Sequence, residues 1–279
     1  MRIADLVLTK APAPELVDQV PTGQPMIDHS TCTAQRTGAE RLGTERHGPQ
    51  RYRCDMTPAA SNIRHDPTTA GHTVHMSIWY GANVADESEL RLCGDVAGKR
   101  VIELGIPAHA TSPTPNAVMP NSVTAAIAGA KAMALDPSPQ AIASVRAAAD
   151  RAEVKVQCHQ GDLADLGFAT SASVDLVVAA HTLEGVDDLP RLLRQVHRVL
   201  KPGAPFVLAM THPIAAMFGS NDHTASAAYG AHSITFTELY MSFERSNFRL
   251  DVVHELNDHR VREPVCPSVL VVRARKQGD

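Results

Sequence analysis

The sequence of 279 residues has few aromatic residues, and this shortage limits the kinds of fold that it can form. Phe, Trp and Tyr together make up 4% of the chain, with a single tryptophan, whereas hydrophobic residues of all kinds make up 44%. Much of this apolar content is alanine, the residue with the highest helix propensity. The composition therefore indicates a helix-rich layered protein rather than an aromatic-rich sandwich, and the length suits a single α/β domain with an added segment.

An excess of basic residues is also missing. The formal net charge is −4 and the sequence pI is about 6.4. Proteins that bind nucleic acid or an anionic membrane surface usually carry a basic excess. The sequence has no apolar run near the roughly 18 residues that a membrane-spanning helix needs, and its start lacks a basic-then-apolar signal pattern. We therefore expect no nucleic acid and no membrane as a partner.

Paired cysteines and metal-binding spacings are absent as well. The five cysteines are an odd number, lie far apart and include no Cys-x-x-Cys pair. This pattern is typical of a reducing compartment, so we expect a cytoplasmic protein. The histidines between positions 181 and 232 show no i, i+4 pair and no carboxylate–histidine motif. Hence no metal site is predicted.

Residues 99–136 form a strand–loop–helix–strand pattern around which the other segments can be arranged. An apolar run at 101–104 closed by Gly105 predicts a buried strand that turns sharply at its carboxyl end. Asn121 is placed to cap the helix that follows. A second buried strand is predicted at 131–135 and ends at Asp136. In a βαβ unit this carboxylate lies beside the first loop and can accept hydrogen bonds from ribose hydroxyls, so the pattern predicts a nucleoside-type ligand.

Apolar strands and amphipathic helices continue to alternate along the rest of the chain. The first 71 residues differ, because they are rich in Thr, Pro, Arg and His and hold too little apolar surface to offset the entropy of ordering. The predicted helices are 86–93, 140–152, 189–200 and 235–247, and the further strands are 154–158, 174–180, 205–210, 248–256 and 267–274.

Two motifs resemble those of class I S-adenosylmethionine-dependent methyltransferases. Residues 103–105, Glu-Leu-Gly, match the start of the first family motif, and the helix, Lys-Pro-Gly turn at 201–203 and strand after it match a later region. The resemblance covers residues 75–279. It implies an α/β, Rossmann-like three-layer αβα sandwich with a mostly parallel seven-stranded sheet, whose antiparallel last strand lies beside the fifth. The expected organisation is an irregular amino-terminal arm or lid at 1–71 and a methyltransferase-like domain at 72–279.

The resemblance also implies S-adenosylmethionine as the cofactor and assigns residues to its pocket. Asp136 would bind the ribose, Asp162 would accept a hydrogen bond from the adenine amino group, and the backbone of Leu163 would meet the adenine ring. The ring of Tyr80 would face the sulfonium, although Tyr80 and Trp79 could instead pack the preceding segment onto the sheet. His212 is a candidate substrate contact, and no catalytic residue is assigned. The full predicted cofactor set is Tyr80, Glu103, Gly105, Asp136, Pro137, Asp162, Leu163, Ala180 and His181.

The loop after Gly105 departs from the family pattern. Pro107 and His109 stand where the pattern has its second and third glycines, and Asp136 follows Gly105 by 31 positions (136 minus 105) rather than about 20. Glycine reaches positive φ and lets the backbone approach a ligand, whereas proline fixes φ and has no N–H to donate. The longer loop therefore forms either a different wall of the same pocket or a weakened or closed one.

Three functions are consistent with these features. The leading hypothesis is methyl transfer to a small molecule, because no basic footprint for nucleic acid is present. The alternative is a methyltransferase-like protein with weakened or lost cofactor binding and a binding or regulatory role, as the missing glycines suggest. A nicotinamide-dependent oxidoreductase is the third, but the sequence has no Tyr-x-x-x-Lys pair. Oligomeric state is not predicted.

Overall fold

A computed structural model describes residues 77–110, 118–184, 186–219 and 224–278. These residues lie within one compact unit, residues 66–279. The predicted arm at 1–71 lies outside the described residues. None of the helices in the described ranges is long and apolar enough to cross a lipid bilayer.

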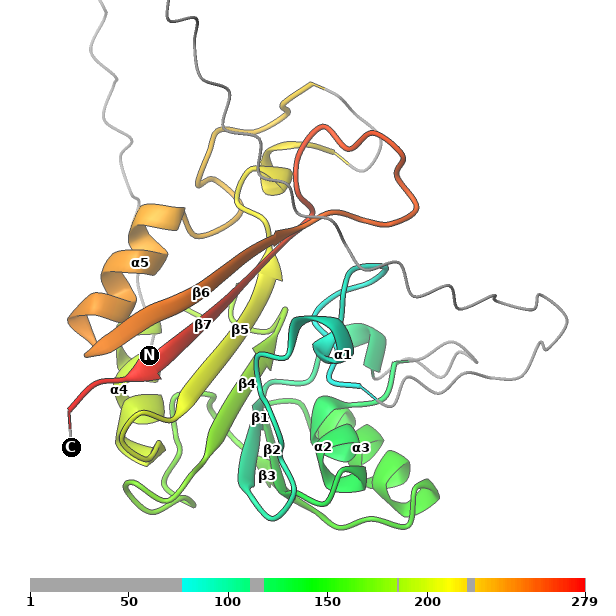
Figure 1. The fold of residues 1–279 in the computed structure, drawn as a ribbon, viewed down its shortest axis with the longest axis vertical. Coiled ribbons are helices and arrows are strands. Elements are labelled where there is room, and N and C mark those ends of the chain that lie inside the picture. The colour runs from blue at the N-terminus through cyan, green and yellow to red at the C-terminus, as the bar shows by residue number, and fades with distance from the viewer. Residues whose placement is uncertain (1–76, 111–117, 185, 220–223, 279) are drawn as a thin grey trace, which may run out of the picture. The chain divides into compact units, whose positions relative to one another are not determined.

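Seven strands form a single mixed sheet in the order β3-β2-β1-β4-β5-β7-β6 (Figure 1). The first five strands are parallel, and β7 lies antiparallel between β5 and β6. The predicted sheet, with its antiparallel last strand beside the fifth, is therefore confirmed. The strands are β1 Arg100–Leu104, β2 Lys131–Asp136, β3 Val156–Gln160, β4 Leu176–Ala180, β5 Pro205–Thr211, β6 Phe248–Leu256 and β7 Val269–Lys276.

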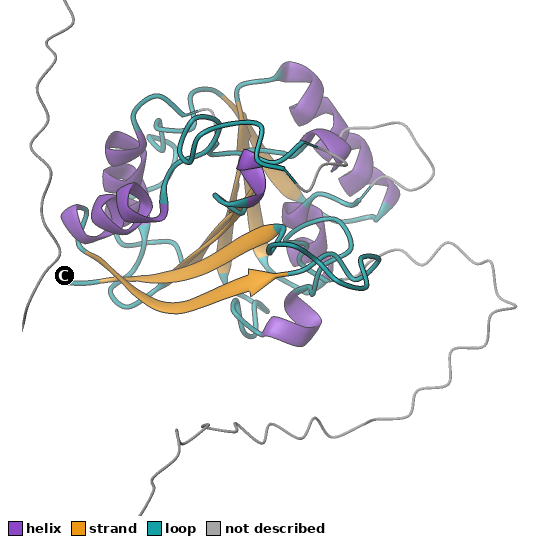
Figure 2. Cartoon of the chain, turned by 90° about the horizontal axis from the view of Figure 1, so that it is seen from above, coloured by secondary structure: helices purple, strands orange, loops and turns teal. Residues whose placement is uncertain are grey.

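Helices cover both faces of the sheet, which confirms the three-layer sandwich (Figures 1 and 2). On one face lie α2 (Asn121–Ile127) and α3 (Pro139–Arg151), and on the other lie α4 (Leu189–Val199) and α5 (Phe236–Arg245). Each helix buries an apolar stripe against the strands, as amphipathic helices do. Three short turns complete the described elements: α1 (Glu87–Leu90), η1 (Ala108–Ala110) and η2 (Ala215–Met217).

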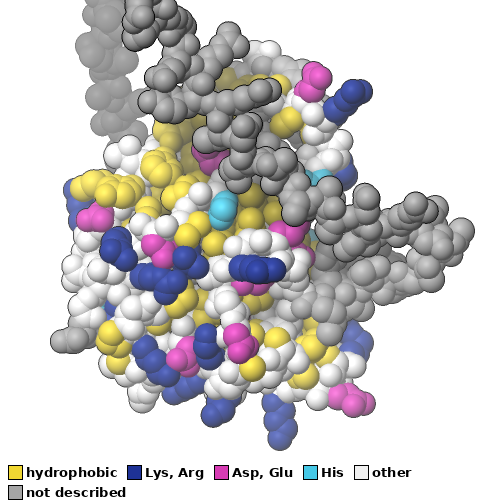
Figure 3. Space-filling view, in the orientation of Figure 1, with side chains coloured by type: hydrophobic (Ala, Val, Ile, Leu, Met, Phe, Trp, Pro, Cys, Tyr) yellow, Lys and Arg dark blue, Asp and Glu magenta, His cyan; other side chains and the backbone are white. Residues whose placement is uncertain are grey.

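The surface seen in Figure 3 carries charges of both signs. In the coloured part of this face, basic and acidic side chains are interspersed, and neither sign covers a continuous area. Ion pairs among the described residues include Lys201 with Asp175 (2.6 Å) and Arg273 with Asp251 (2.9 Å). Interspersed charges of this kind create no strong local field for attracting a polyanion on the coloured part of this face.

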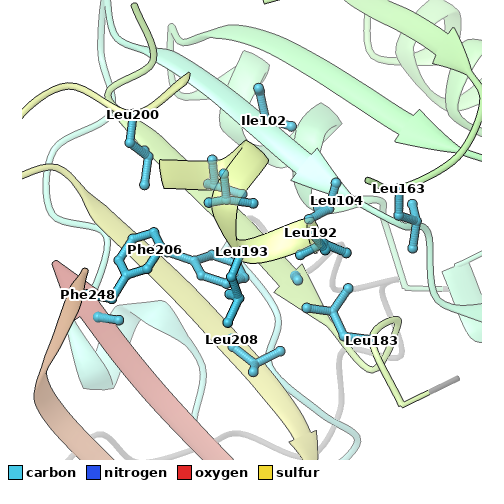
Figure 4. Packing of buried hydrophobic residues seen from close by; sticks show 14 of the residues in the cluster. Ile102, Leu104, Leu163, Leu183, Leu192, Leu193, Leu200, Phe206, Leu208 and Phe248 are labelled. Carbon is cyan, nitrogen blue, oxygen red and sulfur yellow. The ribbon is translucent and has the colours of Figure 1, made fainter. Parts of the chain in front are cut away.

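The core on the α4 and α5 face joins strands and helices into a rigid layer (Figure 4). Leu192 and Leu193 of α4 are fully buried in the same cluster as Ile102 and Leu104 of β1. Three of the few aromatic rings gather at its other end, with centroid distances of 5.7–6.2 Å among Phe206, Phe243 and Phe248. Close packing on this scale holds the strand ends in fixed positions.

The first helix is shorter than the sequence predicts. Asp86 caps it by accepting a hydrogen bond from the Ser88 N–H (2.8 Å), as expected of an N-cap residue. The helix ends after one turn, however, at Arg91, whose φ is 52°. The Glu87 carboxylate causes the chain to fold back there, because it accepts hydrogen bonds from the N–H groups of Leu92 and Cys93 (both 2.8 Å).

Three strands, β3, β4 and β7, begin two residues later than the apolar runs indicate, and for the first two a helix end is the reason. The N–H of Val154 donates to the Ala149 carbonyl (3.0 Å) and so completes the end of α3, which delays β3 until Val156. Val174 forms only an isolated bridge with Leu200, and β4 begins at Leu176. In both cases a helix end takes backbone groups that a strand would otherwise use.

Candidate functional site

Five parallel strands bring polar side chains to one edge of the sheet. Glu103 is the last residue but one of β1, and Asp136 is the last residue of β2. Asp162 follows β3, His181 follows β4 and His212 follows β5. Because these strands are parallel neighbours, their carboxyl ends meet at the same edge. Open α/β sheets bind ligands at this edge, so the structure brings the predicted site residues to one place.

Gly105 makes the turn out of β1 that the sequence predicts. Its φ is +79°, and its N–H donates to the Leu135 carbonyl (2.8 Å). A Cβ added to Gly105 would lie 2.4 Å from the Cβ of Thr182, closer than real atoms approach. Thr182 in turn donates its hydroxyl proton to the Leu104 carbonyl (2.6 Å). Glycine is therefore required here both by the backbone angle and by the close approach of β4.

Glu103 is fully buried, and its carboxylate holds the beginning of α2. It accepts hydrogen bonds from the N–H groups of Asn121 and Ser122 (both 2.8 Å) and from the Ser122 hydroxyl (2.6 Å). These are N–H groups that a helix leaves unpaired at its start. The prediction that Asn121 caps α2 is therefore wrong: the N-cap position is Pro120, and the acceptor comes from β1.

Burial raises the pKa of the Glu103 carboxyl to about 7, although its hydrogen bonds to α2 oppose this shift. The nearby charge of Asp136 adds a smaller upward contribution. The side chain thus gains or loses a proton close to neutral pH while it supports the loop between β1 and α2.

Asp136 lies at the end of β2 with 7% of its surface exposed. One carboxylate oxygen accepts a hydrogen bond from the Ile106 N–H and the other from the Ser138 N–H (both 2.7 Å). The first bond ties Asp136 directly to the loop that follows Gly105, beside which the sequence predicts this carboxylate to lie, and the ribose contact itself stays a prediction. An ionised carboxylate has about four acceptor sites, and described backbone N–H groups use one on each oxygen of Asp136.

The two residues predicted to contact the adenine, Asp162 and Leu163, follow β3. Asp162 accepts a hydrogen bond from the Ala164 N–H (2.9 Å) and pairs with Arg191 of α4 (3.3 Å). A hollow of about 270 Å³ opens beside it, at the end of β3. The remaining predicted residues differ in access, because Pro137 is exposed whereas Leu163 and Ala180 are buried. The lining of the hollow is Leu135, His159, Gln160, Gly161, Asp165, Gly167 and Phe168.

Tyr80 occupies the core instead of the mouth of a pocket. Its side chain is completely buried, and its hydroxyl donates to the Glu87 carboxylate (2.6 Å) and lies 3.2 Å from the Cys93 sulfur. Burial raises the pKa of this phenol far above its ordinary value. The structure therefore supports the packing alternative for Tyr80, and it offers no exposed ring face for a sulfonium.

Trp79, by contrast, is part of a row of three rings at the sheet edge. Its ring centroid lies 4.1 Å from that of His109 and 5.7 Å from that of His181. The backbone of Trp79 is held by the side chain of Asn121, which accepts from its N–H (2.8 Å) and donates to its carbonyl (3.0 Å). His109 entered the sequence argument only as a missing glycine, and nothing local in the sequence indicates its contact with Trp79.

His181 is held on both sides of its ring. Its φ is +55°, its Nε2 lies 2.9 Å from the Tyr80 carbonyl, and its Nδ1 lies 3.5 Å from the Glu184 carboxylate. The hydrogen bond from His181, with a further one from the Thr211 N–H, lowers the pKa of Glu184 to about 2. His181 therefore links the segment before β1 to the ends of β4 and β5.

His212 is buried with both ring nitrogens engaged. Its Nδ1 accepts a hydrogen bond from the Ile214 N–H (3.2 Å), so its Nε2 carries the proton that is donated to Glu255 of β6 (2.9 Å). These contacts make His212 a link between β5 and β6, so the structure does not support it as a substrate contact. In the described ranges no three His, Cys, Asp or Glu side chains are arranged to hold a metal ion.

Comparison with known proteins agrees with this architecture. Residues 120–208 match the family model of a methyltransferase domain. A solved S-adenosylmethionine-dependent methyltransferase from Mesorhizobium loti is 24% identical and has a TM-score of 0.52, with 67% of this chain and 95% of that chain covered. One from Methanosarcina mazei is 19% identical, with a TM-score of 0.50 and coverage of 68% and 97%. No curated protein matches the sequence. The predicted resemblance to class I methyltransferases is confirmed.

S-adenosylmethionine is the cofactor that this domain and fold imply, and the carboxylates fit it. The free acceptor sites of Asp136 suit two ribose hydroxyls, and Asp162 is open enough for a second contact at the end of β3. The hydrogen bond from the Ile106 N–H to Asp136 shows that the loop backbone still approaches this carboxylate, although positions 107 and 109 are not glycine. Residues 111–117 of the same loop lie outside the described part of the chain.

Proposed function

Because residues 120–208 match a methyltransferase domain on a class I fold, we propose that the protein transfers a methyl group from S-adenosylmethionine to a small molecule. The observation that carries this proposal is the row of acidic side chains at successive strand ends. Glu103 supports the start of α2, Asp136 accepts from the loop after Gly105, and Asp162 follows β3. In the proposal, Asp136 binds the ribose and Asp162 the adenine amino group.

The cofactor supplies an activated methyl group bound to a positively charged sulfur. The chain has to hold this group in line with the acceptor and exclude water. In displacement reactions, such positioning accounts for much of the decrease in the activation free energy. Asp136 and Asp162 would orient the nucleoside half. The locked turn at Gly105 would keep the loop backbone close to it.

A small-molecule acceptor is supported by the mixed charge of the surface and the net charge of −4. Neither nucleic acid nor a membrane is part of the proposal, and a cytoplasmic location is included because the cysteines are dispersed. A second candidate is a methyltransferase-like protein with weakened cofactor binding. It is favoured by one observation, the packing of His109 over Trp79, which covers part of the sheet edge.

Calorimetric titration with S-adenosylmethionine and S-adenosylhomocysteine separates these two candidates, with NADH as the negative control. We expect micromolar binding of the first two and none of NADH. Absence of binding up to millimolar concentration would refute the proposal and favour the second candidate.

The same titration of Asp136→Ala tests the ribose assignment. Loss of two hydrogen bonds to a charged group should weaken binding about 100-fold or more. Asp150→Ala, which removes an exposed carboxylate from α3, is the control and should bind normally. Wild-type affinity in Asp136→Ala would overturn the assignment, provided that thermal unfolding shows both variants folded.

A further inference from the structure

We propose that His109 is the general base that removes the proton from an O–H or N–H acceptor during methyl transfer. The inference rests on the proposed function, because it assigns a role in the same reaction. His109 lies in the lengthened loop after Gly105 and is exposed to solvent. Its position at the carboxyl edge of the sheet follows from three contacts on the described residues.

The first contact fixes the backbone of the loop. The turn η1 closes with a hydrogen bond from the Ala110 N–H to the Pro107 carbonyl (2.9 Å), and the Ile106 N–H is held by Asp136. The second and third contacts fix the ring. The imidazole of His109 meets the indole of Trp79 at an interplanar angle of 62°, and the backbone of Trp79 is itself held by the side chain of Asn121. The imidazole is therefore placed by its surroundings and does not simply extend into solvent.

The three histidines at this edge differ in whether they can accept a proton. His181 is engaged through one nitrogen with the Tyr80 carbonyl and through the other with Glu184, and His212 is buried with both nitrogens hydrogen-bonded. The ring nitrogens of His109, in contrast, have no hydrogen bond to any described residue. A general base needs a free lone pair within reach of the proton that it takes. Of these three, His109 is the one whose ring nitrogens no described residue engages, and on this ground we assign it the role.

The surroundings also keep His109 in its basic form. Partial burial against Trp79 lowers its pKa below the ordinary value, and the charge of His181 lowers it further. The carboxylate that contacts this row of rings at His181, that of Glu184, is engaged by His181 and by the Thr211 N–H. At pH 7 the His109 imidazole is therefore mainly neutral and able to accept a proton.

The step balances without a further reactant. The lone pair of the acceptor oxygen or nitrogen forms a bond to the methyl carbon, and the carbon–sulfur bond breaks with its electrons remaining on sulfur. The acceptor proton passes to a ring nitrogen of His109, and then to water because the side chain is exposed. The acceptor class that needs such a base is an alcohol, a phenol or an N–H compound that carries its proton at neutral pH.

Chemical modification tests the free imidazole without knowledge of the acceptor. The full chain is treated with diethyl pyrocarbonate at pH 6, and each modified histidine is located by peptide mass spectrometry. We expect His109 to react at least about tenfold faster than His181, whose hydrogen bonds must first open. Saturating S-adenosylhomocysteine should slow the reaction of His109. Equal rates for the two histidines, or no protection in a protein that binds this ligand, would overturn the inference.

The variant His109→Gln then tests the chemical role, with His197→Gln as the matched control. His197 lies on α4 and donates to the Gln277 carbonyl, a bond that glutamine can replace. His109→Gln should bind S-adenosylhomocysteine within about twofold of wild type, yet methylate phenols and amines on the order of 100-fold more slowly and lose the fall in rate that wild type shows on acidification. A pH profile of His109→Gln that matches wild type would refute the role of His109 as the general base. If wild type fails to bind S-adenosylhomocysteine, the proposed function fails first, and calorimetry reports this separately.

Discussion

Asn121 holds both polar backbone groups of Trp79. Its Oδ1 accepts from the Trp79 N–H and its Nδ2 donates to the Trp79 carbonyl, although 42 residues separate them. The N–H of Asn121 donates in turn to Glu103 at the end of β1. One side chain therefore connects the segment before β1, the end of β1 and the start of α2. The position of the Trp79 ring, and of His109 above it, depends on this connection.

The substitution Asn121→Ala should destabilise the domain and release Trp79. It leaves a buried N–H and a buried carbonyl without partners, and each such group costs about 1–3 kcal/mol. We expect urea unfolding to show a loss on the order of 3 kcal/mol. Because Trp79 is the single tryptophan, its fluorescence should also shift toward that of an exposed indole.

The control for this change is Asn257→Ala, which alters an exposed asparagine between β6 and β7. Its stability should stay within about 0.5 kcal/mol of wild type, as is usual for surface substitutions. If Asn121→Ala is equally harmless and its fluorescence is unchanged, the two hydrogen bonds to Trp79 do not contribute to stability.

The helix that Asn121 begins shows why the sheet is predictable from sequence and the site is not. The strands are recognisable because runs such as 101–104 and 174–180 are apolar over their whole length, as strands buried on both faces must be. The turn at 201–203 has a proline and a glycine whose backbone preferences are local. In contrast, α2 takes its cap from Glu103, 18 positions earlier in the chain, and no local pattern indicates such a partner.

The aromatic side chains of the site illustrate the same limit. Tyr80 is adjacent to Trp79 in sequence, yet Tyr80 points into the core while Trp79 meets His109. Tyr80 is drawn inward by Glu87, whose carboxylate also ends α1 early. A sequence reading can place both residues before β1, but the direction of each ring depends on contacts that form only in the folded chain.

Gly105→Ala should be more damaging than its backbone angle alone explains. A non-glycine residue at positive φ costs about 1–3 kcal/mol, and the new methyl group would also collide with Thr182. Gly203→Ala is the matched control, because Gly203 has a similar φ of +72° and nothing within 4 Å of an added Cβ. Equilibrium unfolding should show a larger loss for Gly105→Ala. Equal losses would show that the chain shifts to relieve the contact.

The raised pKa of Glu103 predicts a fall in stability between pH 4.5 and 7. In this interval the unfolded chain has released the proton that the folded chain still holds, so raising the pH favours unfolding. Each unit of pKa difference corresponds to about 1.4 kcal/mol, which makes the decline measurable. Urea unfolding at pH 4.5, 5.5 and 7 should show it in wild type and show less of it in Glu103→Gln. An identical slope in both proteins would mean that another group is responsible.

The lowered pKa of Glu184 predicts the opposite pH dependence of stability, in a lower range of pH. Its pKa is lowered to about 2 by the bond from His181, so the folded state keeps this carboxylate ionised after the unfolded state has taken up a proton. The stability that it contributes is fully present above pH 4.5 and is lost as the pH falls through 2. In Glu184→Gln the loss of stability between pH 4.5 and 2 should be smaller than in wild type. The control is Glu89→Gln, which changes an exposed residue of α1 that has no contact with His181 among the described residues. A carboxyl signal of Glu184 that titrates near 4.5 by nuclear magnetic resonance would show that His181 does not hold it, and the link from His181 to the end of β5 would then have to be abandoned.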